Sequence, residues 1–93
     1  MEWTKEKLEE LKGFGAAFFS IKKTAFCMEL NVEELQKEIA TQGSEAHLAY
    51  YGSLYASEAK VNKCIIELAA NGSHAAQIQA LKLVEFCENE NKL

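Results

Sequence analysis

Apolar and polar residues recur with the period of a helix from the beginning of the chain. Leu8 and Leu11 fall on one side of a segment that Thr4 can cap. This pattern predicts a first helix from about Thr4 to the region 13–15. The apolar residues 16–19 that follow can either continue this helix with a bend or lead out of it.

Two short helices separated by a three-residue turn are predicted next. The first has apolar residues on one face at steps of four and three, namely Ile21, Ala25 and Met28. Residues 29–31 break this helix. Asn31 is a favourable N-cap, and Glu34 three residues later completes a capping-box-like pair, which predicts a third helix from residue 32 to about 41.

This pair of helices has the pattern of a helix-turn-helix. In that motif a small residue in the first helix allows a close crossing, an apolar residue follows in the turn, and another lies midway along the second helix. These places are filled by Ala25, Leu30 and Leu35. Glu29 stands where the turn usually has glycine, so the left-handed conformation is less favourable here. An ordinary helical hairpin is the alternative, and the pattern favours a helix-turn-helix over it.

The second half of the chain predicts one long helix, from residue 45 to about 70. Gly52 is the only glycine in this stretch, and the whole chain has no proline. Its apolar residues recur at intervals of four, three, seven, four and three, which is the repeat that packs helix against helix. They are His47, Tyr51, Leu54, Val61, Ile65 and Leu68.

A last helix is predicted from residue 75 to about 88. Asn71 and Gly72 signal the end of the long helix, and Ser73 can cap the next one. The last helix is apolar over much of its circumference, which indicates two partners: the long helix on one side and another subunit on the other. Residues 88–93 are expected to form a frayed polar tail.

The expected fold is therefore all-α, with a helix-turn-helix region over residues 1–43 and an antiparallel helical hairpin over residues 44–93. The two regions could also form one compact domain. The hairpin is expected to mediate oligomerisation. We expect its interface to contain the aromatic residues and the apolar seam: Tyr51, Leu54, Tyr55, Val61, Ile65, Leu68, Ile78 and Leu81. For the cluster of Tyr50, Tyr51 and Tyr55 a place in the core is an equally favoured alternative.

Charge limits the partners that the chain can bind. The net charge is −4, and all ten basic residues are lysines, so the chain has no guanidinium group to read guanine or clamp phosphate. Any contact with DNA must be local or shared among several subunits.

The sequence contains no recognisable catalytic or metal site. His47 and His74 have no plausible triad partners, and no His or Cys pair has ligand spacing. The three cysteines are far apart and form neither a disulfide framework nor a Cys-x-x-Cys motif, which favours a reducing compartment. We therefore expect neither catalysis nor a cofactor, and no membrane segment or signal peptide.

Two segments resemble phage small terminase subunits, which are DNA-packaging proteins of the helix-turn-helix type. Residues 21–35, IKKTAFCMELNVEEL, resemble the helix-turn-helix, and residues 59–82, AKVNKCIIELAANGSHAAQIQALK, resemble the oligomerising hairpin. The more specific part of the resemblance is a helix followed by Ala-x-Asn-Gly-Ser and then by a second helix. The resemblance implies a non-catalytic subunit that binds viral double-stranded DNA and delivers it to a large ATPase–nuclease subunit. It also implies the cytoplasm of a phage-infected or prophage-bearing bacterium.

The residues expected to contact DNA are the polar groups of the two short helices. Lys22 and Lys23 on the first, with Lys37 and Gln42 on the second, are expected to contact phosphates, and Gln36 is the best candidate to reach a base edge. So few contacts make binding weak per subunit, and an oligomer would strengthen it by avidity.

Two other functions remain open at this point. A helix-turn-helix transcription regulator would be a dimer that binds two related half-sites. A helical adaptor would bind only proteins, and its likeness to a helix-turn-helix would come from ordinary helix packing.

Overall fold

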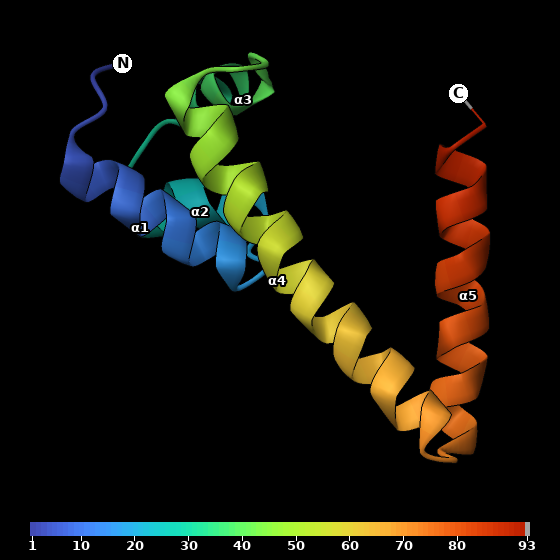
Figure 1. Cartoon of the computed structure of the whole chain (residues 1–93). Coiled ribbons are helices and arrows are strands. Elements are labelled where there is room, and N and C mark those ends of the chain that lie inside the picture. The colour runs from blue at the N-terminus through green and yellow to red at the C-terminus, as the bar shows by residue number, and fades with distance from the viewer. Residues whose placement is uncertain (93) are drawn as a thin grey trace. The chain divides into compact units, whose positions relative to one another are not determined.

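The computed structural model describes residues 1–92 and confirms an all-α fold. Within these residues there are five helices and no strand (Figure 1). The helices are α1 (Lys5–Ala16), α2 (Ile21–Cys27), α3 (Val32–Ala40), α4 (Glu45–Ala70) and α5 (His74–Glu90).

Side-chain caps determine where most of these helices begin. The predicted caps Thr4, Asn31 and Ser73 each accept a hydrogen bond from the backbone N–H three residues later. Ser20 does the same at the start of α2. Each cap satisfies one of the N–H groups that a helix start leaves without a partner, typically contributing about 1 kcal/mol.

The end of α1 decides between the two alternatives that the sequence left open, and the end of α5 differs from the prediction. The helix α1 ends at Ala16, and Phe18 adopts a left-handed conformation with φ 60°, so residues 17–19 lead out of the helix. The helix α5 continues to Glu90. The prediction of a frayed tail from residue 88 was therefore wrong for residues 88–90, and Leu93 lies outside the described residues.

The chain divides into two compact units, and the division falls inside α4. The first unit comprises Met1–Ser57, and the second begins at Glu58. The boundary at residue 43 expected from the sequence coincides with the end of the α3 region and not with the division between the two units. The reason is that the first turns of α4 contribute Ala46, Ala49 and Tyr50 to the core of the first unit.

The core of the first unit is built from alanine, leucine, isoleucine and tyrosine side chains of all four of its helices. The buried residues are Leu11, Ala25, Leu35, Ile39, Ala46, Ala49 and Tyr50. Gly15 is buried where α1 meets α4, and a Cβ atom there would overlap the carbonyl oxygen of Tyr50 and lie 3.2 Å from its carbonyl carbon. Only glycine allows α1 to approach the backbone of α4 this closely.

Tyr50 also ties α4 to the turn between α1 and α2. Its hydroxyl donates a hydrogen bond to the carbonyl oxygen of Phe19. Burial raises the pKa of the Tyr50 phenol above its ordinary value of 10.0, and the neighbouring Tyr51 phenolate adds to the shift. The hydroxyl therefore stays a hydrogen-bond donor throughout the physiological pH range.

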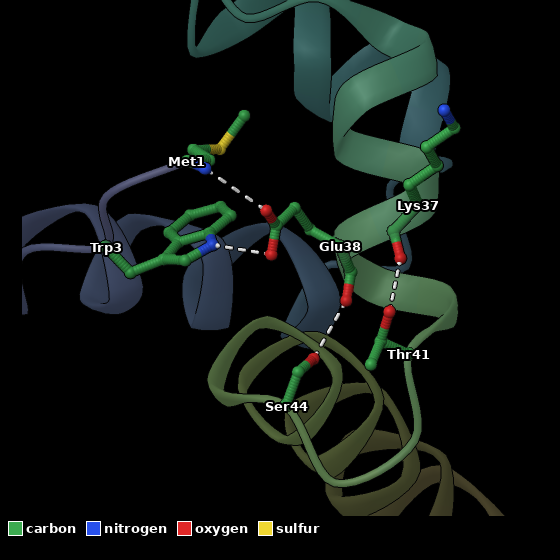
Figure 2. A network of polar contacts seen from close by, with 6 residues as sticks. All are labelled: Met1, Trp3, Lys37, Glu38, Thr41 and Ser44. Carbon is green, nitrogen blue, oxygen red and sulfur yellow. Dashed lines mark hydrogen bonds and ion pairs between the residues drawn. The ribbon is translucent and has the colours of Figure 1, made fainter.

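Glu38 on α3 joins the N-terminal segment to the start of α4 (Figure 2). Its carboxylate accepts a hydrogen bond from Trp3 Nε1 at 3.4 Å and pairs with the N-terminal ammonium of Met1 at 3.4 Å. Its backbone carbonyl accepts a hydrogen bond from Ser44 Oγ at 2.8 Å. At the same end of α3, Thr41 Oγ1 donates to the carbonyl oxygen of Lys37 at 2.9 Å. These contacts fix the C-terminal end of α3 within the first unit.

The second unit contains the rest of α4, a tight turn and α5. Gly72 has φ 97°, and the backbone N–H of Ser73 donates to the carbonyl oxygen of Leu68 at 3.0 Å. This arrangement ends α4 as the Asn71-Gly72 signal predicts. Among the described residues of this unit, Ala76 is the only buried one. The second unit therefore has almost no apolar core of its own.

Candidate nucleic-acid interface and assembly surface

The turn between α2 and α3 is stabilised by backbone hydrogen bonds around a left-handed residue. Glu29 adopts φ 57°, and the backbone N–H of Leu30 donates to the carbonyl oxygen of Ala25 at 2.9 Å. This is the hydrogen bond of a helix end with a left-handed residue, a place that glycine usually fills. Ala25 and Leu35 are fully buried, and α2 packs against α3. The small residue at Ala25 allows this close packing.

The predicted DNA-contacting residues around α3 are all exposed. Gln36 and Lys37 lie on α3 itself. Gln42 lies in the turn after the helix, because α3 ends at Ala40, so placing Gln42 on the helix was wrong. Glu33 and Glu34 lie in the first turn of α3. Their carboxylates interact favourably with the positive end of the helix dipole and would repel a DNA phosphate.

The two lysines of α2 lie in a different chemical environment. Lys22 and Lys23 are exposed and line a depression of about 460 Å³ together with Phe19 and Phe26. Phe26 is 85% exposed, the highest value among the exposed large apolar residues. Phe26 is not among the predicted binding residues, although it lies off the face formed by Ile21, Ala25 and Met28 and is therefore expected to face solvent. A depression lined by phenyl rings and lysines suits a partner that is both apolar and acidic.

Part of the predicted oligomer interface packs within the first unit. Tyr51 and Leu54 are half-buried against the core of this unit. Tyr55 is exposed, and its ring stacks on that of Tyr51 with 5.7 Å between centroids. The ring of His47 lies 5.1 Å from that of Tyr51, so three aromatic rings form a row along α4.

The rest of the predicted interface lies in the second unit and is largely open to solvent. Val61, Leu68, Ile78 and Leu81 are exposed, and Ile65 is half-buried. Three further large apolar residues are exposed there that the predicted interface left out, namely Ile66, Val84 and Phe86. Ile66 lies next to Ile65 of the seam, and Val84 and Phe86 lie beyond Leu81 on α5. A helix that is apolar over a wide arc has no single seam, so a seam leaves such residues out.

A groove runs between α4 and α5 within the second unit. One part has a volume of about 300 Å³ and is lined mainly by apolar side chains: Asn62, Ile66, Ala80, Leu83, Val84, Cys87 and Glu88. A neighbouring part of about 460 Å³ has Glu58 and Glu90 in its wall. Glu58 and Glu90 therefore place carboxylates in the wall of the groove, which opposes closure of the two helices over an apolar core.

The histidines and cysteines form no cluster that suggests chemistry. His47 Nδ1 lies 2.7 Å from the carbonyl oxygen of Ile39, which assigns the ring to helix packing. All three cysteines are exposed thiols. Within residues 1–92 no group of three His, Cys, Asp or Glu side chains is placed to hold a metal ion. None of the helices described is long and apolar enough to cross a bilayer.

Compared with known proteins, the chain matches no family model, no curated sequence and no solved structure.

Proposed function

We propose that this chain is a non-catalytic subunit of the phage small terminase type. It assembles through α4 and α5, binds double-stranded DNA through the helix-turn-helix region, chiefly its α3 part, and delivers the DNA to a large ATPase–nuclease subunit. The proposal rests on the resemblance of residues 21–35 and 59–82 to that family and on the geometry of the two units.

The geometry of the turn between α2 and α3 is the observation that carries the proposal. Glu29 takes the left-handed conformation in the place where helix-turn-helix proteins usually have glycine. Ala25 is buried before this turn and Leu35 is buried after it. Holding a glutamate in this conformation costs about 1–2 kcal/mol. A compact crossing of α2 and α3 is a benefit that would offset that cost.

The apolar surface of the second unit supports self-assembly. Seven large apolar residues are 46–68% exposed there: Val61, Ile66, Leu68, Ile78, Leu81, Val84 and Phe86. At about 200 Å² for such a residue in the open, they leave roughly 700 Å² uncovered, close to the ~800 Å² that each partner buries in a standard interface. So much exposed apolar area, on a unit with one buried residue among those described, supports contact with other copies of the chain.

The α3 region supplies the proposed DNA contacts. The Lys37 ammonium would contact a phosphate, the Gln36 amide would reach a base edge, and Gln42 would contact the backbone beyond the helix. Glu33 and Glu34 oppose this binding electrostatically, so one copy binds weakly. In an oligomer several copies contact one duplex, and each added phosphate contact steepens the salt dependence by about 0.9 in the log–log slope.

The test is fluorescence anisotropy of a labelled duplex at several salt concentrations, with wild-type protein and two variants. We expect the wild-type protein to bind the duplex at low salt and to lose this binding as the salt concentration rises. Lys37→Glu should bind the duplex more weakly than wild type. Lys60→Glu, which makes the same charge change on the second unit, is the matched control and should bind like wild type. Equal binding by both variants would contradict the proposed DNA contact.

A protein-binding adaptor is the second candidate, and the exposed Phe26 together with Glu33 and Glu34 favours it. An adaptor would show no salt-sensitive DNA retention at any ionic strength. Replacing Lys22, Lys23 and Lys37 with glutamate would then leave DNA binding unchanged.

Subunit number separates the proposed function from a helix-turn-helix transcription regulator. A regulator would sediment as a stable dimer, which suits two half-sites. A packaging subunit should form an assembly of more than two copies in sedimentation-velocity experiments. Neighbouring genes for a large ATPase–nuclease and a portal protein would support the packaging function directly.

A further inference from the structure

The exposed face of α2 is a small apolar and basic surface. We call it the α2 patch and define it by Phe19, Lys22, Lys23 and Phe26, which line one depression. The segment from Gly13 to Met28 contains these two lysines and no carboxylate, although the chain as a whole is acidic. The 85% exposure of Phe26 leaves its ring in water. Covering this ring with an apolar group would be favourable, and a carboxylate nearby would pair with the lysines.

An exposed face of α5 carries the complementary chemistry. We call it the α5 stripe and define it by Ile78, Leu81, Glu85 and Glu88, which follow one another at steps of three, four and three. Leu81 is 68% exposed and Ile78 is 50% exposed. Both glutamates are exposed as well, and Glu88 lies at the rim of the groove. Lys82 is the only cation of this helix, against three glutamates.

We propose that the α2 patch of one copy binds the α5 stripe of a second copy. The apolar part of the stripe covers Phe26, and Glu85 and Glu88 pair with Lys22 and Lys23. At helical rise the stripe spans about 15 Å and the helical part of the patch, from Lys22 to Phe26, spans about 6 Å, so the stripe is long enough to reach across the patch. The two surfaces match in charge and in apolar character, which is the reason for choosing a second copy as the occupant.

This contact joins unlike surfaces, so it repeats from copy to copy. A copy that offers its stripe to one neighbour can offer its patch to the next, and such head-to-tail contacts build rings or filaments. The inference rests on the self-assembly in the proposed function and adds α2 to the helices that make the contacts between copies. It assigns Lys22 and Lys23 to the neighbouring copy and leaves DNA to Gln36, Lys37 and Gln42.

Charge reversal on each side tests the pairing. The pair Lys22→Glu and Lys23→Glu, and separately the pair Glu85→Lys and Glu88→Lys, should each weaken self-association at least about tenfold in sedimentation equilibrium, since each juxtaposes like charges. The variant with all four changes should regain self-association to within about threefold of wild type, because the pairs are restored with opposite sign. Circular dichroism checks the helical content of each variant, and Phe26→Ser adds an uncharged probe of the same contact.

The outcomes separate this inference from the proposed function. Full self-association in both double variants and in Phe26→Ser would overturn the inference and leave the proposed function intact. So would failure of the fourfold variant to recover, because the lysines and glutamates would then not face each other. A monomeric wild-type protein would overturn both. The fourfold variant should also assemble and bind DNA through α3. If an assembled fourfold variant did not bind DNA, Lys22 and Lys23 would be DNA contacts and not contacts between copies.

Discussion

Replacing Gly15 with alanine should destabilise the first unit, although alanine is the better helix former. In the middle of a helix alanine is favoured over glycine by about 1 kcal/mol. Against this gain, the new Cβ would overlap the carbonyl oxygen of Tyr50. That oxygen belongs to the backbone of α4 and cannot rotate away, so α1 must shift. Such overpacking typically costs about 1–3 kcal/mol, and a clash with backbone belongs at or above the upper end.

Gly13 offers a matched control in the same helix. A Cβ at Gly13 has no atom within 4 Å, so Gly13→Ala keeps the helix-propensity gain without the clash. We expect Gly15→Ala to lose about 2 kcal/mol and Gly13→Ala to gain up to about 1 kcal/mol. For a domain of this size the loss corresponds to a fall in Tm of roughly 10 °C.

Urea and thermal unfolding followed by circular dichroism measure both variants. The difference between the variants, about 3 kcal/mol, is the quantity to compare, since helix propensity largely cancels in it. Equal stability of Gly15→Ala and Gly13→Ala would refute the close approach of α1 to α4.

Three further substitutions test separate features of the fold. Glu29→Gly should raise the free energy of unfolding by about 1 kcal/mol, because glycine adopts the left-handed conformation without strain, and unchanged or lower stability in urea would count against that strain. The raised pKa of Tyr50 means that the folded state holds this proton more tightly than the unfolded state. The resulting stability is complete below pH 10 and is lost as the pH rises through the folded pKa. In plots of unfolding free energy against alkaline pH, Tyr50→Phe should therefore fall less steeply than wild type. Equal slopes for the two proteins would exclude a contribution from the Tyr50 proton. Ser73→Ala removes the cap on the Ala76 N–H and should lower the stability of α5 by about 1 kcal/mol, which hydrogen exchange along α5 would detect; unchanged exchange would show that the cap contributes nothing.

The positions of the helices could be predicted because local chemistry determines them. Thr4, Asn31 and Ser73 act as caps through their own backbone neighbourhood, and Gly72 ends α4 by its own conformational freedom. Each of these signals involves residues within one or two turns of one another. The extension of α5 to Glu90 had no such signal, because a polar sequence alone does not end a helix.

Contacts between distant segments could not be predicted in the same way. The contact of Gly15 with the backbone of Tyr50 joins residues on different helices, and nothing in the local pattern of α1 indicates it. The hydrogen bond from Trp3 to Glu38 is equally distant in sequence.

The exposed polar residues of the candidate site could be predicted from the sequence, but the side chains that surround them could not. Gln36 and Lys37 are exposed as expected. The position of Phe19 beside Lys22 and Lys23 became visible only in three dimensions, as did the role of Tyr51 and Leu54 in covering the core. A spacing of three and four residues shows which side chains share a face, but it does not show what lies against that face.

The most direct test of the proposed function is the salt dependence of duplex binding by the assembled protein. In the log–log plot of affinity against salt, the proposal predicts a negative slope steeper than one copy's contacts can give, and a smaller slope for the assembled Lys37→Glu variant. No DNA retention at low salt, or an unchanged slope in that variant, would contradict it.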